Sequence, residues 1–267
     1  MTAPILVACA HGTDNQDGRA VVSSIIDQAR ALLNRVTVVE TYVDVQSPQL
    51  PQVLGELDGE ESAVVVPLLL SGGYHVHHDI ACAVAARNQS GAPTRATNTL
   101  GPHQLLAQVQ RDRIAQAASR FARGSSTDIC SVILVAAGSS DGRAQQDVER
   151  QAQYLADATG AEVSVAYLSA AQPTVEQAVA QLVDNRVPNA PLDYRDSADQ
   201  GPAARPIVLS SFLLAPGFFH TKLQGIAADL TTPEHPIIVT EALGSDPRIS
   251  QIVAERYLGA TLSLAKP

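Results

Sequence analysis

The feature of this 267-residue sequence that most constrains its fold is an internal repeat. The apolar run Ile5–Ala10 reappears as Ile133–Ala137, and an Asp-Gly-Arg-Ala tetrapeptide follows each copy after a short stretch of small or polar residues. The segments Pro67–His75 and Ser211–His220 form a second pair of similar sequences in the same order. Because an ordered series of matches indicates one unit used twice, we predict a duplicated domain.

Each predicted half, 1–124 and 125–267, alternates between strand-like and helix-like patterns. In the first half, short apolar runs predict strands near residues 4–10, 36–43, 62–70 and 93–98, with amphipathic stretches between them. Alternating strands and helices favour a parallel sheet that is covered by helices on both faces. We therefore predict two similar α/β domains, each with a doubly wound parallel sheet. The Pro- and Asp-rich segment 187–205 is predicted to be a surface loop of the second half.

Composition and charge exclude several classes of protein. The net charge of −9 disfavours nucleic acids and anionic membrane surfaces as partners. No apolar run reaches the roughly 18 residues of a membrane span, and the N-terminus has the pattern of a strand rather than of a signal peptide, so we expect a cytoplasmic protein. Three unclustered cysteines provide neither a disulfide framework nor a CxxC metal motif. The absence of a Walker A motif disfavours chemistry driven by ATP.

Three potential metal ligands follow consecutive predicted strands of the first half. His11 follows the first strand, Asp44 the second and His75 the third. Parallel strands end at one edge of a sheet, where ligands of α/β proteins bind. Two imidazoles and one carboxylate are a typical ligand set for a first-row divalent ion, and Gly72 and Gly73 allow a flat ligand to approach the backbone.

The second half lacks most of this set. The sequence match places Gly138 opposite His11, Ser169 opposite Asp44, and either Phe219 or His220 opposite His75. We therefore predict a single metal site, in the first half, with the second half forming the other wall of a cleft. His77 and His78 are open to two interpretations, as auxiliary ligands for metal entry or as surface residues at the start of a helix.

The motifs themselves resemble a known family. The segment Ala10–Thr13, the segment Pro67–His75 and the Tyr-Val-Asp that ends at Asp44 are similar to those of the sirohydrochlorin chelatases, which are class II tetrapyrrole chelatases. The resemblance extends over nearly the whole chain outside segment 187–205. It implies two chelatase-like domains facing each other across a cleft, with the metal bound by residues of the first. The residues implied are the catalytic histidines His11 and His75, the metal ligands His11, Asp44 and His75, and the substrate-binding residues Thr13, Ser71, Gly72, Gly73, Tyr74 and His220.

The function implied by the resemblance is insertion of a divalent metal ion into sirohydrochlorin without ATP. The metal is expected as a substrate, with no organic cofactor, and the chain is expected to be a monomer with pseudo-two-fold symmetry. Fe²⁺ for siroheme biosynthesis is favoured, because the sequence ends in LSLAKP without the His-rich or Cys-containing tail of some cobalt-associated relatives. Arg19, Arg143 and Lys222 are candidate donors for the substrate carboxylates.

Three other functions share part of this pattern. Insertion of Co²⁺ for cobalamin biosynthesis and a non-catalytic metal or tetrapyrrole carrier remain open as alternatives, because all would use the same ligands. A histidine phosphatase also has a histidine after its first strand, but it requires an arginine before that histidine. Here Ala10 precedes His11, so a phosphatase is disfavoured.

Overall fold

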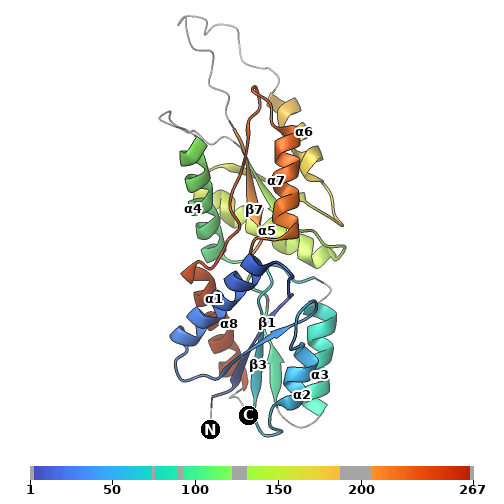
Figure 1. The fold of residues 1–267 in the computed structure, drawn as a ribbon, viewed down its shortest axis with the longest axis vertical. Coiled ribbons are helices and arrows are strands. Elements are labelled where there is room, and N and C mark those ends of the chain that lie inside the picture. The colour runs from blue at the N-terminus through green and yellow to red at the C-terminus, as the bar shows by residue number, and fades with distance from the viewer. Residues whose placement is uncertain (1–2, 74–75, 90–92, 122–130, 187–205, 265–267) are drawn as a thin grey trace, which may run out of the picture.

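The computed structural model describes residues 3–73, 76–89, 93–121, 131–186 and 206–264. It contains two four-stranded sheets with the strand orders β2-β1-β3-β4 and β6-β5-β7-β8, in which every pairing is parallel. The two sheets are stacked along the long axis of the molecule (Figure 1). The strands are β1 (Ile5–Ala10), β2 (Val38–Tyr42), β3 (Ala63–Pro67), β4 (Thr94–Ala96), β5 (Ser131–Ala136), β6 (Glu162–Tyr167), β7 (Ile207–Phe212) and β8 (Ile237–Val239).

Helices cover both faces of each sheet, which confirms the predicted fold class. One hydrophobic cluster joins the inner faces of the two sheets through α1, α4, α5 and α8, while separate clusters pack α2 and α3 on the first sheet and α6 and α7 on the second. The helices are α1 (Gln16–Leu32), α2 (Leu50–Glu56), the π-helical turn η1 (Val76–Ile80), α3 (Ala81–Gln89), α4 (Gln104–Phe121), α5 (Gly142–Thr159), α6 (Val175–Arg186), α7 (Phe218–Leu230) and α8 (Pro247–Leu264).

The central strands are buried on both faces, as their apolar sequences predict. In β1, the side chains of Leu6 and Ala8 enter the shared inner cluster, whereas those of Val7 and Cys9 enter the outer cluster of the first sheet. This alternation follows from the two-residue period of a strand. Burial also raises the pKa of the Cys9 thiol to about 12, because a thiolate would lose its hydration there. Cys9 is therefore a packing residue.

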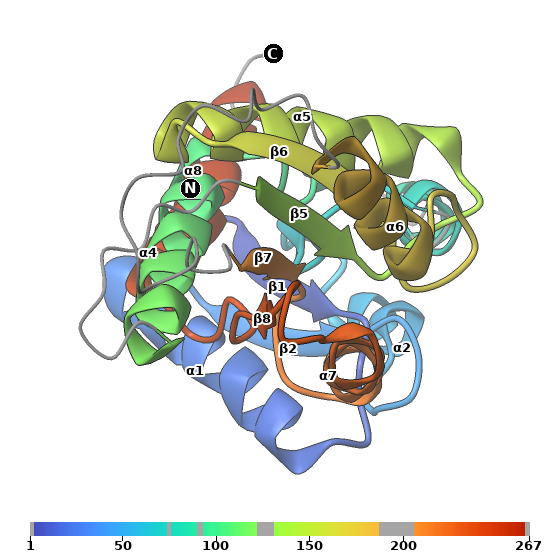
Figure 2. The ribbon, with the colours of Figure 1, turned by 90° about the horizontal axis from the view of Figure 1, so that it is seen from above.

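The last helix of each repeat packs on the sheet of the other repeat. Helix α4 follows the first sheet in sequence but contacts α5, β7 and β8, whereas α8 follows the second sheet and contacts α1, β3 and β4. Figure 1 shows this exchange directly: α8, in red, lies beside α1, and α4, in green, lies beside β7. The view along the long axis places α1, α4 and α8 on the same side of the two sheets (Figure 2). Each sheet is therefore covered in part by a helix from the other sequence repeat, so a repeat does not form a separately packed domain.

Polar contacts fix the exchanged helices in place. The buried side chains of Gln110 on α4 and Gln151 on α5 are joined by a hydrogen bond of 2.9 Å. On α8, the Tyr257 hydroxyl donates to the carbonyl oxygen of Pro4 at 2.6 Å, and Arg256 Nε donates to the carbonyl oxygen of Thr99 at 2.8 Å. Each exchanged helix is thus held by hydrogen bonds as well as by apolar packing.

Two predictions about organisation fall outside the described residues, namely the boundary between residues 124 and 125 and the surface loop 187–205. Among the helices that the structure describes, none is long and apolar enough to cross a membrane.

Candidate metal and substrate site

The candidate site lies where the order of the first sheet reverses direction. Strand β1 lies between β2 and β3. The chain therefore first adds β2 on one side of β1 and then crosses over to add β3 on the other side. Ligands of open parallel sheets bind beyond the carboxyl ends of the strands at such a reversal. His11 directly follows β1, and Ser71, Gly72 and Gly73 lie just beyond β3, so the chain order places these predicted site residues at the reversal.

His11 and Asp44 are brought together by backbone contacts. The amide of Asp44 donates a hydrogen bond of 3.0 Å to the carbonyl oxygen of His11, directly after the pairing of β1 with β2. Gly12 adopts a φ of +95°, and a Cβ at this position would lie 2.1 Å from the carbonyl oxygen of Asp44. Glycine is therefore required here, because any side chain would separate the loops that carry the predicted ligands. The side chains of His11 and Asp44 are both exposed at the rim.

Further hydrogen bonds stiffen this part of the rim, and the sequence pattern did not reveal the part that Gln46 plays in them. The amide of Thr13 donates to the Gln46 side-chain oxygen at 2.8 Å, and Arg19 Nε donates to the carbonyl oxygen of Thr13 at 2.7 Å. Nearby, the Tyr42 hydroxyl donates to the Glu40 carboxylate. Burial and this carboxylate raise the pKa of Tyr42 to about 12. Gln46 therefore ties the loop after β1 to the loop after β2, and Arg19 ties the loop after β1 to the start of α1.

The third predicted ligand, His75, and the predicted substrate contact Tyr74 lie outside the described residues, as does the side chain of His77. Ser71 and Gly73 are half-buried, Gly72 is buried, and His78 in η1 is exposed. Among the side chains that the structure describes, no three His, Cys, Asp or Glu residues gather into a metal-binding group. The predicted set of His11, Asp44 and His75 thus stays a prediction, with two of its three members placed at one rim.

The rim of the second half corrects one detail of the sequence match. Gly138 corresponds to Gly12 rather than to His11, because Gly138 has a φ of +99° and a Cβ there would lie 1.8 Å from the carbonyl oxygen of Ser169. The counterpart of His11 is therefore Ala137. Ser169 is the counterpart of Asp44, as predicted, and its hydroxyl donates to the carbonyl oxygen of Ala137 at 2.8 Å. Neither Ala137 nor Ser169 supplies an imidazole or a carboxylate.

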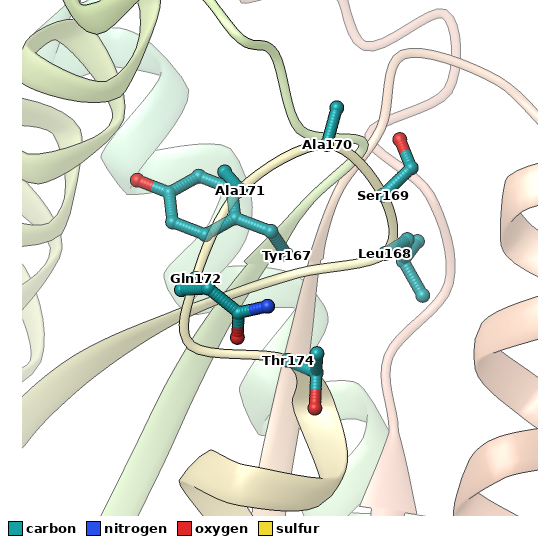
Figure 3. Close-up of a pocket in the computed structure, with 7 residues that line it drawn as sticks. All are labelled: Tyr167, Leu168, Ser169, Ala170, Ala171, Gln172 and Thr174. Carbon is teal, nitrogen blue, oxygen red and sulfur yellow. The ribbon is translucent and has the colours of Figure 1, made fainter.

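A cavity of about 260 Å³ lies at this second rim, within the loop that joins β6 to α6. Figure 3 shows that the loop arches around the space, with the Tyr167 ring and the other side chains that line it drawn as sticks. No histidine, cysteine, aspartate or glutamate is among its lining residues, so it has no ligand set for a divalent cation. The lining residues are Tyr167, Leu168, Ser169, Ala170, Ala171, Gln172 and Thr174.

His220, a predicted substrate contact, is nearly buried in the second half. Its side chain is only 6% exposed, and its Nε2 atom lies 3.1 Å from the carbonyl oxygen of Thr240. The imidazole therefore packs between the first turn of α7 and the segment after β8. The expected contact of His220 with the substrate stays a prediction, and this burial leaves His220 out of the contacts proposed below.

The carboxyl-terminal edges of the two sheets contact each other. The amide of Gly72, beyond β3, donates to the Asp147 carboxylate of α5 at 2.8 Å. In the opposite direction, a Cβ on Gly18 of α1 would lie 2.9 Å from the carbonyl oxygen of Pro216, beyond β7. Each loop that follows a third strand thus reaches the first helix of the other half, so the two contacts are related by a pseudo-two-fold arrangement of the halves. The candidate site lies beside these crossing contacts.

Basic side chains occur on both sides of this junction. Lys222 Nζ donates to the carbonyl oxygen of Leu168 at 2.6 Å, which places an ammonium group at the second rim. Arg143 is exposed and forms a bidentate contact with Asp141, at 3.0 and 2.7 Å. The Arg19 guanidinium lies at the first rim through its bond to Thr13. Basic side chains from both halves therefore lie at or near the two rims, and those of Arg143 and Arg19 also pair with the carboxylates of Asp141 and Asp14.

The fold is that of the two-domain sirohydrochlorin chelatases. A structure of SirB from Bacillus subtilis with Fe³⁺ matches with a TM-score of 0.72 and 16% identity, covering 97% of this chain and 95% of that one. The chelatase SirB from Bacillus subtilis subspecies spizizenii in complex with cobalt matches with a TM-score of 0.71 and 16% identity, over 98% and 96% of the two chains. A CbiX structure, described as the terminal enzyme of siroheme biosynthesis in denitrifying bacteria, has a TM-score of 0.61, 19% identity and coverage of 98% and 100%.

A comparison of the sequence with family models identifies the family to which the chain belongs. The CbiX family model matches residues 5–117 and 131–192, so the chain belongs to the CbiX family of class II chelatases. Among curated proteins, no sequence matches this chain. The resemblance inferred from the motifs around His11 and His75 is thereby confirmed at the level of the family.

Proposed function

We propose that this protein inserts a divalent metal ion into sirohydrochlorin without nucleotide hydrolysis, at the rim formed by His11 and Asp44. The observation that carries the proposal is the hydrogen bond between the backbones of these two residues at the strand-order reversal of a chelatase fold. Family membership supports the same reaction. We further propose that the metal site belongs to the first half, 1–124, and that 125–267 is a repeat that does not hold metal.

The reaction requires a proton acceptor close to a cation-binding group. Insertion of M²⁺ forms bonds from the metal to the macrocycle nitrogens, releases two protons from pyrrole N–H groups and releases water from the ion. A neutral imidazole can bind the cation or accept one of these protons near pH 7. We assign these roles to His11 and His75. The Asp44 carboxylate at the same rim stabilises both the cation and a protonated imidazole.

The macrocycle would lie at the junction between the two rims. We propose that Thr13 and the segment that contains Ser71, Gly72, Gly73 and Tyr74 contact it from the first half. Sirohydrochlorin is a polycarboxylate, and Arg19, Arg143 and Lys222 would compensate its charge in a protein whose net charge is −9. Fixing the macrocycle over the bound ion lowers the entropic part of the barrier.

We propose Fe²⁺ as the first physiological metal to test and Co²⁺ as the alternative. Both metals are compatible with imidazole and carboxylate ligands, so the ligand types alone do not separate them. The similar SirB structures contain Fe³⁺ in one case and cobalt in the other. Competition between equal concentrations of Fe²⁺ and Co²⁺ under anaerobic conditions, with the products separated by chromatography, determines the preference.

The activity itself is tested by incubating the purified protein with sirohydrochlorin and Co²⁺ or Fe²⁺ and following the change in the absorption spectrum. We expect many turnovers per protein molecule without any nucleotide. A non-catalytic carrier would produce at most one equivalent of metallated product per chain. An absolute requirement for ATP would contradict the proposal.

A further inference from the structure

We propose that Asp147 is a positioning residue for metal insertion, through which the second half of the protein holds the metal-binding segment of the first half. Its carboxylate accepts the hydrogen bond of 2.8 Å from the amide of Gly72. Gly72 belongs to the connection between β3 and η1, and Asp147 belongs to α5. The inference rests on the proposed function, because it concerns the placement of a predicted metal ligand of that site.

The contact is suited to hold a backbone in place. Gly72 is buried, so its N–H group needs a partner inside the protein. A carboxylate is a stronger acceptor than a neutral group, and its bonds are shorter and more energetic. Among the described residues, no cationic side chain forms an ion pair with Asp147. The carboxylate is therefore directed to the first half rather than to a partner on its own helix.

Gly72 lies close in sequence to a predicted metal ligand, so its contact with Asp147 bears on the metal site. His75 follows Gly72 by three residues, and three residues of chain span at most about 11 Å. Fixing Gly72 therefore restrains the start of the short segment that leads to His75. Gly72 and Gly73 restrict their own backbones less than other residues do, so this segment needs an anchor from elsewhere.

A second approach to the same segment comes from the second half. A Cβ on Gly73 would lie 3.4 Å from the hydroxyl oxygen of Ser139, which is ordinary contact distance. The connection after β3 therefore lies against the second half at two successive residues. The repeat that lacks the metal ligands still contributes to the reaction, because it supplies the surface and the acceptor that set this connection.

The experiment compares three variants of the full-length protein. Asp147→Ala removes the acceptor, Asp147→Asn retains an oxygen that can accept from Gly72, and Glu149→Ala removes the same charge from an exposed position of the same helix. Two quantities are measured: hydrogen exchange in the peptide that contains Gly72, and the dependence of the initial rate on Co²⁺ concentration at saturating sirohydrochlorin. A purely structural role would alter overall stability without changing the metal dependence selectively.

We expect faster exchange at Gly72 and a roughly tenfold lower kcat/KM for Co²⁺ in Asp147→Ala, in line with the loss of a hydrogen bond to a charged group. The KM for sirohydrochlorin should change by less than about twofold. The variants Asp147→Asn and Glu149→Ala should stay within about threefold of the wild type in both measurements.

Two results would overturn the proposal. Unchanged exchange at Gly72 in Asp147→Ala would show that the bond does not protect this segment in solution, and increased exchange with an unchanged Co²⁺ dependence would leave Asp147 without influence on the metal site. Absence of turnover in the wild type would instead contradict the proposed function. In that case, the positioning role of Asp147 is tested by measuring Co²⁺ affinity with calorimetry. A roughly tenfold lower affinity in Asp147→Ala supports this role, and an affinity equal to that of the wild type excludes it.

Discussion

The amide of Asp44 donates a hydrogen bond of 3.0 Å to the carbonyl oxygen of His11, and Gly12 lies against the carbonyl oxygen of Asp44. The two predicted ligands are therefore held by their main chains, at the ends of the neighbouring strands β1 and β2. Their side chains remain exposed at the rim. A rigid backbone with accessible side chains is what a site needs if it must both receive a metal ion and release it.

His11→Ala should lower the rate of metal insertion by at least ~100-fold, which is the usual contribution of a general base. His75→Ala should have a similar effect. His235→Ala should retain the wild-type rate, because His235 precedes β8 and so lies at the opposite end of its sheet from the rim. His103→Ala should also retain it. Initial rates of variants with unchanged circular dichroism test this assignment, and a near wild-type rate for His11→Ala would show that it is wrong.

Gly12→Ala should separate the loops that carry His11 and Asp44. An alanine at a φ of +95° costs about 1–2 kcal/mol before any clash is counted. We expect a lower midpoint of urea denaturation together with weaker Co²⁺ binding. Gly55→Ala is the matched control, because Gly55 lies in α2 with open space around its Cβ position. The control should be neutral or should stabilise the protein by roughly 0.5–1 kcal/mol.

A fragment of residues 1–124 should not be a stable folded monomer. The fragment retains α4, whose apolar face packs on the second sheet, and lacks α8, which covers the first sheet beside α1. It would therefore expose apolar surface on both the sheet and the helix. Size-exclusion chromatography and circular dichroism should show an unfolded or self-associated fragment. A compact monomer with cooperative unfolding would contradict the importance of the helix exchange.

The stability of the protein should decrease as the pH falls below about 6.5, the ordinary pKa of histidine. Burial lowers the pKa of His103, and this effect outweighs the attraction of the Glu255 carboxylate at 3.2 Å from its Nε2 atom. The unfolded chain then binds a proton at a pH at which the folded protein does not. The contribution of His103 to the free energy of unfolding is therefore fully present above the pKa that this histidine has in the unfolded chain. It is lost as the pH falls from that pKa toward the lower pKa of His103 in the folded protein.

Replacing His103 by glutamine tests this linkage. Urea unfolding between pH 5 and 8 should show a smaller pH dependence in His103→Gln, by at most ~1.4 kcal/mol per pH unit for one proton. His235→Gln, the same substitution at a histidine of the loop before β8, serves as the control. If His103→Gln and the wild type have the same slope, another group is responsible.

Several properties of this protein were determined by the sequence alone. The buried strands β1 and β3 could be predicted because short continuous apolar runs are typical of strands in a sheet that is covered on both faces. The repeat predicted two similar domains, and the rule that ligands bind beyond the carboxyl ends of strands placed His11 and Asp44 at one rim. These inferences succeed because periodicity and strand order are properties of short segments and of their order along the chain.

Only the tertiary structure decided which sheet each terminal helix covers and which residues meet across the junction. The apolar faces of α4 and α8 fit similar sheets, so nothing in their sequences distinguishes the helix's own half from the other one. Asp147 lies inside a helix without a local motif, and its bond to Gly72 joins residues of different halves. The burial of His220 likewise depends on the segment after β8. Contacts of this kind are set by the packing of distant segments, which a local pattern does not encode.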